Sequence, residues 1–116
     1  MKEILKKYPL LRDQNVPRET FIQFESFITM LQKRNEEINI ISKETARNEV
    51  IRERHIVDCL QIIDFVDLKS NIITDIGSGG GMPGIIISIM IKKSKNPIKV
   101  NLYEKSHHKS SFLRKV

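Results

Sequence analysis

The 116-residue chain has little of what marks secreted, disulfide-bonded or membrane-spanning proteins. Its single cysteine, Cys59, excludes an internal disulfide and a cysteine-built metal site, and it favours a reducing compartment. The longest largely apolar run, residues 84–91, is far shorter than the ~20 residues with which a helix crosses a bilayer. Residues 1–13 are interrupted by charges and do not resemble a signal peptide. We therefore expect a cytoplasmic protein with no membrane partner.

Acidic residues are scarce in the second part of the chain, which carries the whole net charge of +6. Residues 1–70 balance their acidic and basic side chains, whereas residues 71–116 contain only Asp75 and Glu104 as acids. A basic surface attracts polyanions such as RNA, although solvated lysines are an equally good explanation for any single position. The basic residues of this part are Lys92, Lys93, Lys95, Lys99, Lys105, Lys109, Arg114 and Lys115.

Residues 1–70 read as a helical region. Apolar residues recur at helical spacing after Pro17 and predict an amphipathic helix to about Arg34. Further helices are expected at residues 43–52 and 54–66, followed by a polar break at 67–71. The residues that set the first pattern are Phe21, Phe24, Phe27, Ile28 and Leu31.

Residues 71–116 have the order of a βαβ unit, which predicts an α/β fold with a parallel sheet. We expect a buried strand, a helix, a second strand and a further helix, at residues 72–76, 85–91, 98–103 and 106–116. The isoleucines of 85–91 also suit a strand, but Pro83 and the need for a crossover favour a helix. Such a helix is apolar nearly all round and, beside only two strands, would lie half uncovered.

Glycine is rare and unusually placed, since all five glycines lie within residues 77–84, directly after the first expected strand. Glycine tolerates unusual backbone angles and lets a ligand approach the main chain. A turn between a strand and a helix is expected to direct backbone N–H groups and the positive helix end at an anionic or polar ligand. A tight turn without a ligand is the structural alternative.

The spacing of the turn distinguishes between nucleotide-binding motifs. A dinucleotide fingerprint requires a third glycine where Met82 stands, which disfavours a nucleotide-dependent oxidoreductase, and a P-loop requires a lysine that is absent here. The remaining pattern, acidic-x-Gly-x-Gly-x-Gly, resembles the first motif of methyltransferases that use S-adenosyl-L-methionine. That resemblance implies that Asp75 holds the turn and that Glu104, which ends the second strand, accepts hydrogen bonds from the ribose hydroxyls.

Four segments in fixed order resemble one methyltransferase family. Residues 31–42 are similar to the signature L-x-x-W-N-x-x-x-N-L-x-S, and residues 54–60 to R-H-I-x-D-S-L. The glycine turn continues into Met82-Pro83-Gly84, and residues 109–114 are similar to K-x-x-F-L-R. Together they identify the chain as a member of the RsmG family, also called glucose-inhibited division protein B.

The resemblance implies methyl transfer from S-adenosyl-L-methionine to guanine N7 of bacterial small-subunit (16S) ribosomal RNA. Because guanine N7 carries a lone pair, we expect no catalytic base; His107 and His108 are adjacent and would face different sides of a helix, so we expect no metal site, and we expect a monomer. Asn35 and Asn39 are expected to make local structural contacts, whereas the roles of Arg54, His55 and Asp58 stay open. The implied cofactor-binding residues are Asp75, Gly77, Ser78, Gly79, Gly81, Met82 and Glu104.

The sequence departs from the family at three points. Arg34 stands where the family usually has tryptophan, and Cys59 where it usually has serine. Family members usually continue well past this length, so residues 71–116 are expected to be the start of a Rossmann-like methyltransferase domain, truncated after two strands. An inactive truncated remnant, or a basic RNA-binding fragment without catalysis, is therefore the alternative function.

Overall fold

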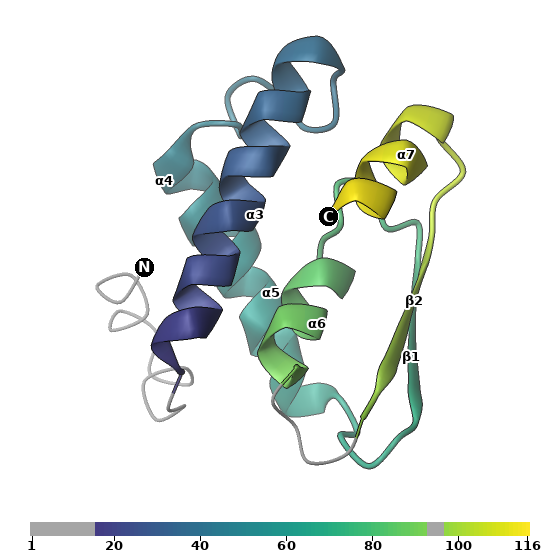
Figure 1. Cartoon of the computed structure of the whole chain (residues 1–116). Coiled ribbons are helices and arrows are strands. Elements are labelled where there is room, and N and C mark those ends of the chain that lie inside the picture. Colours follow the sequence, from purple (N-terminus) through teal and green to yellow (C-terminus); the bar gives the residue numbers. More distant parts are fainter. Residues whose placement is uncertain (1–15, 93–96) are drawn as a thin grey trace.

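The computed structural model describes residues 16–92 and 97–116, which form a helical layer packed against one face of a small sheet (Figure 1). The expected α/β class is confirmed. The helical part comprises α3 (Arg18–Glu37), α4 (Asn48–Val50), the π-helical segment η1 (Ile51–Val57), α5 (Asp58–Gln61) and the 3-10 segment η2 (Ile62–Phe65). The second part comprises β1 (Ile72–Ile76), α6 (Gly84–Ile91), β2 (Lys99–Tyr103) and α7 (His107–Lys115).

Helix α3 confirms the amphipathic pattern predicted after Pro17, which immediately precedes the helix. Four of its apolar side chains are at most 2% exposed and start the hydrophobic core. Burying an aromatic or aliphatic side chain of this size stabilises the fold by about 1.5–3 kcal/mol. The four are Phe24, Phe27, Ile28 and Leu31.

The two helices expected at residues 43–52 and 54–66 are one continuous helical segment. Residues 43–46 form turns, the helix begins at Asn48, and it runs without a break through η1, α5 and η2 to Phe65. The buried side chains of Ile51 and Ile56 are five residues apart, a spacing that matches the i to i+5 bonding of a π-helix. The sequence pattern did not indicate this geometry.

Strands β1 and β2 are parallel, with Ile72 opposite Lys99 and Ile76 opposite Tyr103, as the βαβ prediction requires. The expectation that β1 is buried is wrong. Ile72 and Ile76 are 56% and 84% exposed, because the described sheet has two strands and the described helices cover only one of its faces (Figure 1).

Helix α6 lies between the helical layer and the sheet, in contact with α3, α5 and β2. The expectation that this helix lies half uncovered is wrong, because Ile86 and Ile87 are at most 4% exposed and no residue of α6 is exposed. A groove of about 570 Å³ remains between α3 and α6, with Phe27 and Ile89 among its lining residues. This groove follows the body of α6 and is separate from the glycine turn that precedes the helix.

Asn35 connects the end of α3 to the following loop. Its Oδ1 accepts hydrogen bonds from the backbone N–H groups of Ile40 and Ile41, both at 2.8 Å. These bonds place Ile40 in the core, 7% exposed and beside Gly80. The prediction that Asn35 makes a local structural contact is confirmed.

Substituting Asn35→Ala should lower the free energy of unfolding by about 1–3 kcal/mol, because two partly buried N–H groups lose their acceptor. Urea unfolding followed by circular dichroism measures the change. Asn39 is exposed and its side chain makes no hydrogen bond to the described residues, so the local contact expected of it is not observed. Asn39→Ala is therefore the matched control and should change stability by less than about 0.5 kcal/mol. Equal effects of the two substitutions would contradict a structural role specific to Asn35.

Candidate functional site

The glycine turn joins β1 to α6 at the carboxyl ends of both strands, the edge where ligands bind in open parallel sheets. Gly77, Gly79 and Gly81 have φ angles of 76°, 56° and 101°. Residues with a Cβ pay about 1–2 kcal/mol for such left-handed angles, so the turn requires glycine at these positions.

The glycine turn has one open side and one packed side. A Cβ added to Gly77 or Gly79 would have no heavy atom within 4 Å. A Cβ on Gly80, Gly81 or Gly84 would instead press into neighbouring atoms, for example at 2.9 Å from a methyl of Ile40 in the case of Gly80. Glycine at 77 and 79 therefore leaves room beside the main chain, whereas the other three glycines allow close packing.

Most backbone N–H groups of the turn are hydrogen-bonded within the protein. Gly77 and Ser78 both donate to the carbonyl of Tyr103, at 2.8 and 3.0 Å, and Gly81 donates to the carbonyl of Ser78 at 2.8 Å. The expectation that the turn directs its N–H groups at a ligand is thus wrong for these three, because Gly77 and Ser78 tie the turn to the end of β2 and Gly81 closes a bond within the turn. The role of Tyr103 could not be predicted from the sequence, since every residue has a backbone carbonyl.

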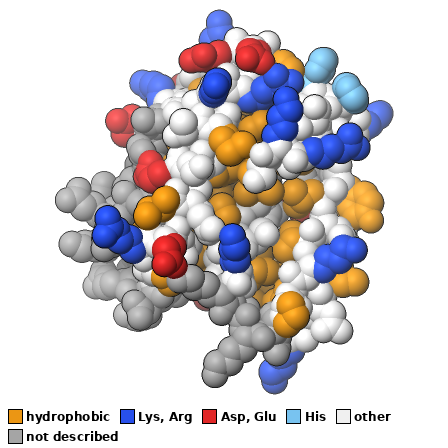
Figure 2. Space-filling model, in the orientation of Figure 1, with side chains coloured by type: hydrophobic (Ala, Val, Ile, Leu, Met, Phe, Trp, Pro, Cys, Tyr) orange, Lys and Arg blue, Asp and Glu red, His pale blue; other side chains and the backbone are white. Residues whose placement is uncertain are grey.

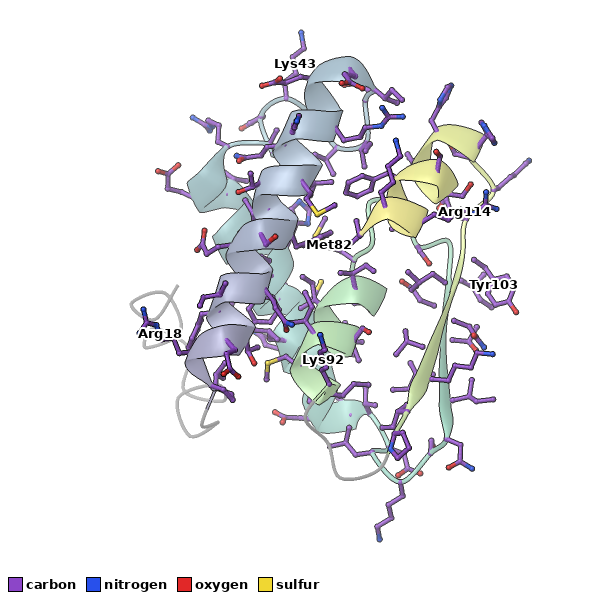
Figure 3. All side chains as sticks on the ribbon, in the orientation of Figure 1. Arg18, Lys43, Met82, Lys92, Tyr103 and Arg114 are labelled. Carbon is purple, nitrogen blue, oxygen red and sulfur yellow. The ribbon has the colours of Figure 1, made fainter. Side chains whose placement is uncertain are left out.

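Asp75 holds the turn from the strand side. Its Oδ2 accepts a hydrogen bond from the backbone N–H of Gly84 at 3.0 Å, which satisfies the first donor of α6. Its carbonyl accepts a bond from the Ser78 hydroxyl at 3.0 Å, and Ser78 is only 1% exposed. Met82 is partly buried and packs against the hydrophobic core (Figure 3). These residues shape the turn, and their contact with a cofactor stays a prediction.

Glu104 crosses from the end of β2 to the open side of the turn. One carboxylate oxygen accepts from the backbone N–H of Gly79 at 2.7 Å, and the other from that of Ser106 at 3.0 Å. The bonds from Ser106 and Gly79, with a smaller contribution from the charge of Lys109, lower the pKa of Glu104 below 4.5. The Gly79 N–H is thus held by a side chain that can rotate, unlike the N–H groups held by Tyr103.

The lowered pKa of Glu104 predicts how stability changes in acid. Because the folded-state pKa lies below the unfolded value, this stabilisation is present above pH 4.5 and is lost as the pH falls through the folded pKa. Urea midpoints measured between pH 7 and pH 3 should therefore fall less steeply for Glu104→Gln than for the native chain. Parallel curves for the two proteins would contradict a charged hydrogen bond at this site.

The segment that resembles R-H-I-x-D-S-L lies in η1 and α5, which contact α6 through α5. Cys59 is 9% exposed, and burial, followed by the charges of Asp58 and Asp75, raises the pKa of its thiol to about 12. A thiol with this pKa is protonated at neutral pH and is no nucleophile. His55 is partly buried and Asp58 is exposed.

The predicted basic residues lie mainly on and around β2 and α7. Lys93 and Lys95 fall outside the described residues. Figure 2 shows basic side chains near the two histidines that begin α7, with others spread over the same face. The last turn of α7 contributes Arg114 and Lys115. The described basic residues of this part are Lys92, Lys99, Lys105, Lys109, Arg114 and Lys115.

In residues 16–92 and 97–116, no group of three or more His, Cys, Asp or Glu side chains is arranged to hold a metal ion. Over the same ranges, no helix combines the length and apolar content needed to cross a membrane.

Comparison with known proteins gives a consistent result. The family model of rRNA small subunit methyltransferase G matches residues 21–116. The chain is 80% identical over its whole length to the ribosomal RNA small subunit methyltransferase G of Pelagibacter ubique (strain HTCC1062), of which it covers 54%. It is 38% identical to the protein of that name from Orientia tsutsugamushi (strain Ikeda), over 88% of the chain and 48% of the relative.

A third relative, from Rickettsia rickettsii (strain Sheila Smith), has the same name and is 40% identical over 87% of the chain and 49% of its own length. The chain thus spans about half the length of the curated relatives it matches. No solved structure matches it. Because the family model covers most of the chain, with the glycine turn inside the match, the chain belongs to the rRNA small subunit methyltransferase G family.

Proposed function

We propose that the chain carries the methyl-donor site of an enzyme that methylates guanine N7 of bacterial 16S ribosomal RNA with S-adenosyl-L-methionine. The observation that carries this proposal is the open side of the glycine turn, bordered by the Glu104 carboxylate, in a member of a ribosomal RNA methyltransferase family. The relatives' names state the class of RNA. The cofactor, the N7 position and a cytoplasmic location are our proposals.

The residues at the turn suit this cofactor. A carboxylate accepts hydrogen bonds from hydroxyl groups and favours a positively charged ligand, as Glu104 would do for the ribose and the sulfonium. Gly77 and Gly79 leave space beside the main chain. Rotation of Glu104 toward a ligand would also release the N–H of Gly79, which, unlike those of Gly77 and Ser78, is held by a side chain. Asp75, Ser78, Gly81 and Met82 would keep the turn in shape.

Guanine N7 carries a lone pair, so no residue has to remove a proton before transfer. When bound, the cofactor supplies a methyl group that its positive sulfur already activates. The contribution of this chain is to orient the donor, for which alignment in intramolecular analogues gives up to about 7–11 kcal/mol. The basic residues around α7 would attract the phosphates of the RNA.

The cofactor proposal is tested by adding S-adenosyl-L-methionine to the ¹⁵N-labelled chain and recording amide shifts. We expect saturable shifts centred on Gly77, Gly79 and Ser106, with competition by S-adenosylhomocysteine. NAD at the same concentration should leave these amides unchanged. Shifts with NAD alone, or no shifts at millimolar S-adenosyl-L-methionine, would overturn the proposal.

The RNA-binding fragment is the second candidate, and the charge of +6 is the observation that favours it. It predicts RNA binding that weakens steeply with salt while the turn amides ignore S-adenosyl-L-methionine. Binding of 16S ribosomal RNA, measured from 50 to 200 mM salt beside the cofactor titration, separates the two functions. Detection of N7-methylguanosine in the RNA would decide for the enzyme.

A further inference from the structure

Glu104 ties the glycine turn to the start of α7. Its Oε2 accepts a hydrogen bond from the backbone N–H of Gly79 at 2.7 Å, and its Oε1 accepts one from that of Ser106 at 3.0 Å. Ser106 is the N-cap residue of α7, and its hydroxyl accepts a bond from the backbone N–H of Lys109 at 3.5 Å. One carboxylate thus connects the open side of the turn with the first turn of the helix.

The body of α7 also packs against the glycine turn. A Cβ added to Gly81 would lie 3.0 Å from Leu113, and the neighbouring Phe112 is 2% exposed in the core. The helix is therefore fixed at two places, by the carboxylate of Glu104 at its start and by apolar contacts near its end. Because the apolar contacts hold the helix in place, a change in the position or charge of Glu104 acts on the start of α7 alone.

Glu104 is the one acidic residue of residues 97–116, which are otherwise strongly basic. Its charge lies at the positive end of the α7 dipole and faces Lys109, which contributes to the lowered pKa of the carboxyl group. A negative charge at this place weakens the attraction of the surrounding basic side chains for a polyanion. Figure 2 shows basic side chains near the two histidines that begin the helix. The basic residues of this segment are Lys99, Lys105, Lys109, Arg114 and Lys115.

We infer that Glu104 couples the methyl-donor site at the turn to RNA binding by α7, so that each ligand strengthens binding of the other. The inference rests on the proposed function. While its carboxylate is held at Gly79 and Ser106, Glu104 lowers the affinity of α7 for RNA. A Glu104 side chain that turns toward hydroxyl donors, with a sulfonium charge nearby, leaves Ser106 and no longer opposes the basic residues. By linkage, RNA on α7 then raises the affinity for the methyl donor by the same factor.

The size of the coupling follows from the exposure of Glu104, which is only partly buried. Coupling between two sites typically changes an affinity about 5- to 150-fold, and charges near water are screened over about 10 Å at 0.1 M salt. We therefore expect the lower end of this range, about fivefold at low salt, with a decline as the salt concentration increases.

The coupling is tested by measuring the affinity of the 116-residue chain for 16S ribosomal RNA with and without saturating S-adenosyl-L-methionine. We expect about fivefold tighter RNA binding with it, and a smaller gain with S-adenosylhomocysteine, which has the same ribose but no sulfonium charge. Unchanged RNA affinity, in a chain whose turn amides shift with S-adenosyl-L-methionine, would overturn the coupling and leave the proposed function intact. Absence of those amide shifts would overturn both.

The substitution Glu104→Gln tests the same inference without any cofactor. It removes the negative charge beside α7 and should tighten RNA binding about fivefold. Glu49→Gln is the matched control, because it makes the same change of net charge at an exposed residue of α4, which lies on the other side of α3 from α7 (Figure 1). It should leave the RNA affinity within about twofold of the native chain. Circular dichroism verifies the helix content of both variants. Equal effects of the two substitutions, or an unchanged RNA affinity of a folded Glu104→Gln chain, would contradict the role of Glu104.

Discussion

The substitution Gly81→Ala is expected to lower the free energy of unfolding by about 2–5 kcal/mol. Gly81 has a φ of 101°, which costs a residue with a Cβ about 1–2 kcal/mol. The added Cβ would also lie 2.6 Å from Ile85 and 3.0 Å from Leu113, and overpacking of this kind costs about 1–3 kcal/mol more. Urea unfolding at pH 7 measures the loss, which is a large fraction of the stability of a small domain.

The substitution Gly77→Ala separates the cost of the backbone angle from the cost of overpacking. Gly77 has a φ of 76°, but nothing lies within 4 Å of its added Cβ. It should therefore lose only the backbone contribution, about 1–2 kcal/mol. If both variants lose the same free energy of unfolding, close packing of Gly81 against Ile85 and Leu113 is contradicted.

The substitution Glu104→Gln is expected to weaken binding of S-adenosyl-L-methionine about 10- to 100-fold. Hydrogen bonds to a charged acceptor are stronger than those to a neutral amide, and the amide that replaces the carboxylate has no charge to offer the sulfonium. The effect follows from the position of Glu104 at the open side of the turn, where its carboxylate oxygen Oε2 lies 2.7 Å from the backbone nitrogen of Gly79. Amide shifts recorded during a cofactor titration give both affinities.

Glu36→Gln is the control because it makes the same change of charge on the exposed side of α3. It should leave the affinity within twofold of the native chain. An unchanged affinity in Glu104→Gln would remove Glu104 from the proposed site. Loss of affinity in both variants would instead indicate a long-range effect of net charge.

The candidate site could be predicted in part. Spacing and residue type identified the turn, and the structure brings Asp75 and Glu104 to it from the ends of β1 and β2. The hydrogen bonds from Gly77 and Ser78 to Tyr103 were not predictable, because any residue has a carbonyl at that position. A pattern of residue types therefore locates the turn but does not say which of its N–H groups are already bonded.

The fold, like the candidate site, could be predicted only in part from the sequence. Local patterns determined the bounds of β1, the helical state of α6 and the parallel pairing, since chain order, Pro83 and β-branched runs act over short distances. Family membership was also readable from ordered motifs. Only the tertiary structure decided that residues 48–65 form one helical segment and that Ile76 is exposed. Both depend on which surfaces the rest of the chain covers, and burial is a property of the assembled layers rather than of any local stretch of residues.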